Sequence, residues 1–74
     1  MTERILQILR DVNEEIISYD GTNMMGDGLV DSFELIDIVS QLEEEFDIEI
    51  DGQYVTVEYF ANKDTIIALI KKLL

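Results

Sequence analysis

The residues best suited to chemistry lie in the segment GDGLVDSFEL, which spans residues 26–35. Its centre is the pair Asp31-Ser32, which follows a glycine-containing turn and precedes an apolar run. Three kinds of chemistry fit these residue types: calcium binding by the loop, simple capping of a helix, and covalent attachment of a group to the Ser32 hydroxyl. Each predicts a different function, so the rest of the chain has to discriminate between them.

The first interpretation compares the segment with the EF-hand calcium loop, which needs oxygen ligands at alternate positions, Gly at the sixth and Glu at the twelfth. With Gly28 at the sixth position, Asp31 and Glu34 fall at the ninth and the twelfth. The first half fits poorly, because Asn23 stands where Asp is preferred and Met25 stands at the third position. A thioether is a poor ligand for a hard cation. A small calcium-binding protein is therefore an alternative, and no metal site is expected.

The second interpretation is that Asp31 or Ser32 only caps a helix that begins here. Both residue types are preferred at helix N-caps, and Asp31 with Glu34 has the spacing of a capping box. Capping alone does not explain why Phe33 and Ile36 fall away from the apolar face of that helix.

Composition excludes several kinds of site. The chain has 74 residues, enough for one small domain, and it has no Cys and no His. Thiol nucleophiles, Cys/His zinc sites and His-based acid–base catalysis are therefore impossible, and an enzyme is not expected. No run of about 20 apolar residues is present, and the N-terminal apolar stretch is too short for a secretory signal. We therefore expect a cytoplasmic protein.

The charge is strongly negative and unevenly distributed. The chain carries 17 acidic and 5 basic residues, a formal net charge of −12, and no basic residue lies between Asp11 and Asn62. Such a field repels nucleic acids and anionic membranes and attracts basic partner surfaces. An interaction module that binds a basic partner through residues 32–46, without covalent modification, is a second alternative.

Three segments have apolar side chains at helical spacing: residues 3–17, 32–46 and 63–73. Thr2 is the expected N-cap of the first helix, and Asn62 is that of the last. Helices this short need one another to bury their apolar faces.

The remaining segments connect these helices. Residues 18–31 contain three glycines without a period, which predicts a long loop. Residues 46–51 alternate apolar and acidic side chains but have no partner strand, so we expect an extended connector. Residues 56–61 are expected to form one or two turns of helix with Thr56 as the N-cap and Phe60 facing inward. The predicted fold is an all-α four-helix bundle, with three main helices, one short helix and a long loop between the first two.

The segment GDGLVDSFELIDIVSQLEEEFDIEI resembles the signature of the acyl carrier protein family, in which an Asp-Ser pair opens the second helix and a Glu-Glu-Phe segment closes it. The resemblance covers nearly the whole chain, so residues 1–74 are expected to be one carrier domain. It implies that Ser32 carries 4′-phosphopantetheine, installed from coenzyme A by a phosphopantetheinyl transferase. The thiol of this arm would hold acyl or aminoacyl groups as thioesters and present them to partner enzymes.

The resemblance also implies roles for further residues. Asp31 is expected to help the transferase engage the site, in addition to capping. The outward face of the second helix is the expected docking surface of a monomeric carrier for enzymes with basic surfaces: Phe33, Glu34, Ile36, Asp37, Glu43 and Glu44. Core residues that can open to shelter an acyl chain are Ile38, Leu42, Phe46, Ile50, Phe60 and Ile66.

Some residues depart from the common pattern of the family. Phe33 follows the serine where Leu is more usual, and the sequence Gly52-Gln53-Tyr54 stands where Pro and acids are frequent. The run from Met24 to Leu29 also differs. These features are more similar to carriers of specialised pathways, including aminoacyl and D-alanyl carriers, than to the main fatty-acid carrier.

Overall fold

The apolar faces of three long helices pack together to form the fold. A computed structural model describes residues 1–74. The α-helices are α1 (Thr2–Val12), α2 (Glu15–Ser18), α3 (Ser32–Phe46) and α4 (Lys63–Leu73), and a 3₁₀ turn, η1, spans Gly52–Tyr54. The chain forms no strand. The predicted all-α fold of four helices is therefore confirmed, with the difference that the short helix is α2 and not the segment 56–61.

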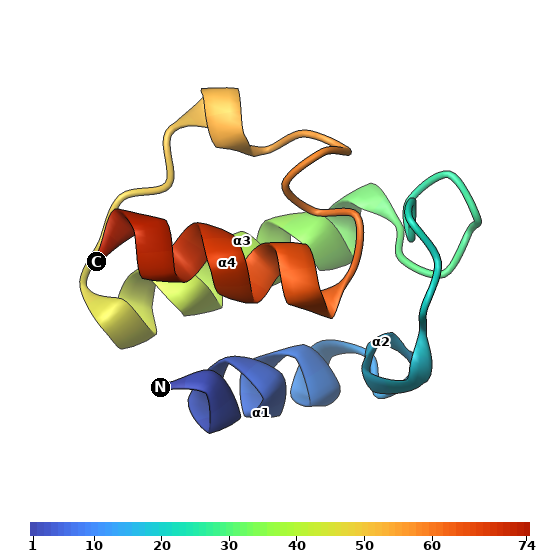
Figure 1. The fold of residues 1–74 in the computed structure, drawn as a ribbon, viewed down its shortest axis with the longest axis horizontal. Helices are drawn as coiled ribbons and strands as arrows, with labels where there is room; N and C mark the ends of the chain where they lie inside the picture. The colour runs from blue at the N-terminus through green and yellow to red at the C-terminus, as the bar shows by residue number, and fades with distance from the viewer.

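The helices pack around α1, which contacts α2, α3 and α4. In Figure 1, α1 runs in the direction opposite to α3 and α4, and the long loop that leads into α3 lies at one end of the bundle. The molecule measures 29 × 24 × 20 Å. No helix combines the length and the apolar character that crossing a membrane requires. The buried side chains form one cluster, whose members with no exposed surface are Ile5, Leu9, Ile16, Met24, Ile38, Leu42, Ile66 and Ile70.

The first helix is shorter than predicted, because Asn13 interrupts the segment 3–17. The backbone of Asn13 is extended, with φ −160°. Its side-chain oxygen accepts a hydrogen bond from the Glu15 N–H at 3.1 Å, and its amide donates to the Leu29 carbonyl at 2.9 Å. A side chain that bonds nearby backbone groups in this way competes with the helix, and α2 begins only after the interruption. The predicted N-cap was also wrong, because Thr2 is already helical and Met1 occupies the cap.

The starts of α3 and α4 agree with the prediction. Asp31 caps α3 by accepting from the Glu34 N–H at 2.8 Å, while the Glu34 carboxylate accepts from the Asp31 N–H at 3.3 Å. Asn62 and Thr65 form the same reciprocal pair at the start of α4. Each box satisfies backbone donors that a helix N-terminus leaves free, and so it fixes the residue at which the helix begins.

The second long connection, residues 47–62, is extended at first and contains η1. Ile50 and Phe60 are buried, as predicted. Over residues 56–61 a single turn forms, the shorter of the two predicted lengths and not a regular helix, closed by the Phe60 N–H and the Thr56 carbonyl at 2.9 Å. Two causes act together: β-branched residues crowd the start of the turn, and the extended Asn62 that α4 needs as its cap ends it. The Thr56 hydroxyl accepts from the Tyr59 N–H at 3.5 Å, in agreement with its predicted role as the cap.

Candidate functional site

Ser32 is the first residue of α3, and its side chain is exposed. The cap is supplied by Asp31, so the fold does not need the Ser32 hydroxyl for capping. That hydroxyl forms no hydrogen bond with the rest of the protein, whereas Ser18 bonds the Glu15 carbonyl at 3.3 Å. The structure therefore presents an unengaged nucleophilic oxygen at the start of its longest helix.

The backbone beside this oxygen favours an anion. In the first turn of α3, the Asp31 carboxylate accepts a hydrogen bond from the Glu34 N–H, and the Asp31 carbonyl accepts one from the Leu35 N–H. The N–H groups of Ser32 and Phe33 precede the first intrahelical bond and have no acceptor in the protein. Free N–H groups at the positive end of the helix dipole stabilise a phosphate attached nearby.

Two large apolar side chains are exposed next to Ser32. Phe33 is 81% exposed and Ile36 is 63% exposed, the two highest values among the large apolar residues. Both lie on the outer face of α3, opposite the buried Ile38 and Leu42. The prediction that they point away from the core is confirmed. Together, Phe33 and Ile36 form a surface beside the serine that we call the apolar patch.

The four acids predicted to face partners have different environments. Asp37 and Glu44 are exposed. Glu34 is partly buried and belongs to the capping box. The Glu43 carboxylate turns toward the connector and accepts from the Ile50 N–H at 2.8 Å. This second role of Glu43 could not be predicted, because its partner lies seven residues further along the chain.

The loop that precedes Ser32 is held by side-chain hydrogen bonds. The Tyr19 hydroxyl donates to the Asp27 carboxylate at 2.6 Å and accepts from the Asn23 N–H at 3.0 Å. The Asn23 side chain in turn accepts from the Gly26 N–H at 2.8 Å. The bond to Asp27, with a smaller contribution from burial, raises the pKa of Tyr19 above its ordinary value. Sequence reasoning missed this network, because residues eight apart in a loop follow no recognisable spacing.

The residues compared with a calcium loop are engaged differently. Asn23 bonds within the loop, and Asp31 and Glu34 bond each other's backbone. Met25 is half-buried against the core. No three acidic side chains in the structure come together as a set of metal ligands.

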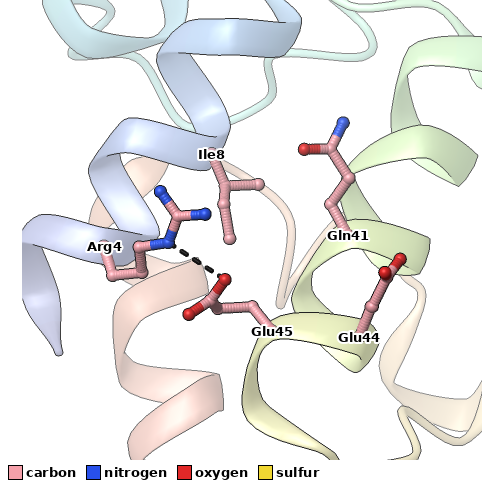
Figure 2. A pocket seen from close by; sticks show the side chains of 5 residues that line it. All are labelled: Arg4, Ile8, Gln41, Glu44 and Glu45. Atoms are coloured by element: carbon pink, nitrogen blue, oxygen red, sulfur yellow. Dashed lines mark ion pairs between the residues drawn. The ribbon is translucent and has the colours of Figure 1, made fainter.

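The residues predicted to shelter an acyl chain lie in the core. Five of them are buried, and Phe46 packs against the same cluster half-buried. The hollows of the molecule lie elsewhere, on its surface. Figure 2 shows the first, a groove of about 360 Å³ between α1 and the C-terminal half of α3, in which Arg4 Nε lies 3.0 Å from Glu45 Oε1. The second, of about 350 Å³, lies between the 58–59 turn and α4.

No protein-family model and no curated protein matches this chain. The function proposed below therefore rests on the residues around Ser32 and on their geometry.

Proposed function

We propose that this protein is a carrier in which the Ser32 hydroxyl holds 4′-phosphopantetheine through a phosphodiester. The thiol at the end of the arm carries an acyl or aminoacyl group as a thioester, and partner enzymes in the cytoplasm act on that group. The chain supplies the attachment point and the docking surface, and it performs no catalysis of its own.

One observation carries the proposal: the Ser32 hydroxyl is exposed at the start of α3 and has no role in the fold. Asp31 provides the cap, and the two amides that follow it are free. A serine in this position is accessible to a transferase, and its modification breaks no contact. The phosphodiester formed there lies at the positive end of the helix dipole.

The attachment step balances without any group from this chain other than Ser32. Its Oγ forms a new bond to the phosphorus of the pantetheine phosphate, and the pyrophosphate bond of coenzyme A breaks. Adenosine 3′,5′-bisphosphate leaves, and the proton of the hydroxyl is released through the transferase. The pantetheine thiol is unchanged, so the carrier gains its thiol in this single step.

The surface beside Ser32 supports docking of basic enzymes. The apolar patch offers area to bury, and Asp37 and Glu44 offer unpaired negative charge on the same helix. The only ion pair in the molecule joins Arg4 to Glu45 at the other end of α3. Charges at the rim of an interface mainly set the association rate and its dependence on salt.

The proposal is tested by counting thiols, since the unmodified chain has no Cys. Purified protein is incubated with coenzyme A and a transferase of broad specificity, the small molecules are removed, and free thiol is titrated together with the intact mass. Wild type should gain one thiol per chain, and Ser32→Ala should gain none. The matched control is Ser40→Ala, since Ser40 is also exposed on α3 and should leave the gain unchanged.

Failure of wild type to gain a thiol, with a transferase that modifies a known carrier in the same assay, would rule out the proposed function. A gain that persists in Ser32→Ala would place the attachment elsewhere.

The docking surface has its own test. Asp37→Lys should slow the modification several-fold at low salt and weaken its salt dependence, because a repulsive charge replaces an attractive one. Glu3→Lys makes the same change in net charge near the Arg4–Glu45 end of α3, roughly 20 Å from Ser32 for a helix of this length. Equal slowing by both variants would show that net charge, and not this face, governs the rate.

A further inference from the structure

The loop over residues 19–31 has few apolar anchors but a defined shape. Only Met24 and Val30 are buried in it. Polar contacts supply further attachments, and they reach two parts of the fold: Asn13 and the residues just before α4. The Asn13 amide holds the Leu29 carbonyl, the Asn62 amide holds the Gly21 carbonyl at 2.8 Å, and the Met24 N–H bonds the Ala61 carbonyl at 3.0 Å.

Tyr19 lies at the centre of the loop's own contacts. Its hydroxyl is both donor and acceptor, so that one oxygen joins the Asp27 carboxylate to the Asn23 N–H. The Asp27 N–H also bonds the Asn23 carbonyl at 2.9 Å. We call Tyr19, Asn23 and Asp27 the tyrosine clasp.

The glycines of the loop fit the tyrosine clasp sterically. A Cβ added at Gly21 would overlap the hydroxyl and ring of Tyr19, and one added at Gly26 would overlap the Asn23 side chain. Gly28 differs, because its φ of +79° requires glycine while the space around it is open. Two of the three loop glycines therefore make room for side chains of the clasp.

The segment between the tyrosine clasp and Ser32 is held by two further backbone hydrogen bonds and one buried side chain. The N–H groups of Leu29 and Val30 both bond the Met24 carbonyl, at 3.0 and 3.2 Å, which closes the loop just after the clasp. Val30 is then buried, and Asp31 caps α3. The shape that the clasp gives the loop thus continues directly into the turn that carries Ser32.

We infer that Tyr19 is a positioning residue for modification of Ser32: its clasp presets the loop beside the serine in the form that the transferase binds. The inference rests on the proposed function and adds to it that the recognition surface includes this loop as well as α3. A preset loop loses less conformational freedom on binding, so removing the clasp raises KM while kcat is maintained.

Tyr19→Phe tests the inference, because it removes one oxygen and keeps the ring. Steady-state modification with coenzyme A and a phosphopantetheinyl transferase should show KM for the carrier raised about three- to tenfold, the range that loss of one or two hydrogen bonds produces, with kcat within about twofold. Tyr59→Phe is the control, because the Tyr59 hydroxyl forms no hydrogen bond in the structure and its loss should leave both constants unchanged.

Asp27 provides an independent variant that leaves the ring in place. Asp27→Ala should raise KM in the same direction as Tyr19→Phe, and the double variant should be no worse than Tyr19→Phe alone, because Tyr19→Phe already deletes the bond to Asp27 together with the bond from the Asn23 N–H. Asp27→Asn keeps an acceptor for the hydroxyl and should restore most of the affinity. Asp27 is exposed, so its substitution leaves no cavity. The Asp27 variants therefore still test the inference if Tyr19→Phe lowers the amount of folded protein.

The possible outcomes separate the two proposals. If wild type is modified and both Tyr19→Phe and Asp27→Ala retain its KM, the positioning role is wrong and the carrier function stands. Additive effects in the double variant, or a fall in kcat with KM unchanged, also contradict the role of the clasp. If wild type gains no thiol, the carrier function fails and the inference fails with it.

Discussion

The two long connections of this protein are held in different ways. The loop over residues 19–31 is fixed by directional polar contacts, with the tyrosine clasp at its centre. The connection over residues 47–62 is fixed mainly by burial, since Ile50, Phe60 and Ala61 all enter the core. Its aromatic contacts are a Tyr54–Tyr59 pair at 5.2 Å and an overlying Lys72.

Hydrogen bonds and burial constrain a loop differently: the first fix its shape, and the second fixes only its position in the fold. Hydrogen bonds fix the direction of the groups that they join, so a loop built from them presents one surface. Burial is non-directional and tolerates rearrangement of the exposed residues around the anchors. The loop over residues 19–31 leads into Ser32, whereas the connection over residues 47–62 starts at the opposite end of α3 and returns to the start of α4 (Figure 1).

Removal of the main apolar anchor in residues 47–62 should lower the stability of the protein more than any other change considered. Phe60 is 1% exposed, and Phe60→Ala should lower the free energy of unfolding by about 3–5 kcal/mol, because the removed ring leaves a cavity. Urea denaturation followed by circular dichroism measures the change. Tyr54→Ala in the same connection is half-buried and should cost clearly less. Equal losses would contradict the view that burial, and not the aromatic pair, holds this connection.

A smaller effect is expected at Asn62, which joins the two connections. Its side chain caps α4 and also donates to the Gly21 carbonyl. Asn62→Ala should cost about 2 kcal/mol, the sum of a cap and a hydrogen bond, and Asn62→Ser should cost about half of this because Ser retains the cap. Thermal and urea unfolding of the two variants separate the contributions. Equal destabilisation by both would show that the bond to Gly21 supplies nearly all of the effect.

Two neighbouring acids give the next comparison. Glu43→Ala leaves the Ile50 N–H without its acceptor and should cost about 1–2 kcal/mol. Glu44→Ala removes an exposed side chain with no such partner and should stay within about 0.5 kcal/mol. Urea denaturation of both variants measures the difference. Similar losses of stability in the two variants would mean that water replaces Glu43 as the acceptor of the Ile50 N–H at no cost.

The elements that could be predicted from the sequence depend on contacts within a few residues. The helix of residues 32–46 follows from its apolar spacing, and its start follows from Asp31 and Glu34, three residues apart. The same holds for Asn62 and Thr65 in front of α4. The position of Ser32 at an exposed helix start was predictable for this reason.

The features that could not be predicted depend on distant partners. Asn13 interrupts the first helix while it holds the carbonyl of Leu29, sixteen residues away. The Glu43 carboxylate turns toward the connector because it accepts a hydrogen bond from the Ile50 N–H, although Glu43 falls on the outer face of a helical wheel. Such pairs have no period in the sequence, since the fold of the intervening chain decides whether they meet.

The smallest effect concerns the pH at which the tyrosine clasp is lost. The bond to Asp27 raises the pKa of Tyr19 above its ordinary value of 10.0, and the neighbouring Asp20 acts in the same direction. Because the folded pKa is the higher one, the stabilisation is fully present below pH 10 and is lost as the pH rises through the folded value. The difference in Tm between wild type and Tyr19→Phe should therefore be constant from pH 7 to about pH 9 and shrink above about pH 10. Effects of pH on the rest of the chain are common to the two proteins and cancel in this difference. Tyr59→Phe serves as the control, and a wild-type advantage that persisted to pH 12 would show that the Tyr19 hydroxyl does not need its proton to hold the loop.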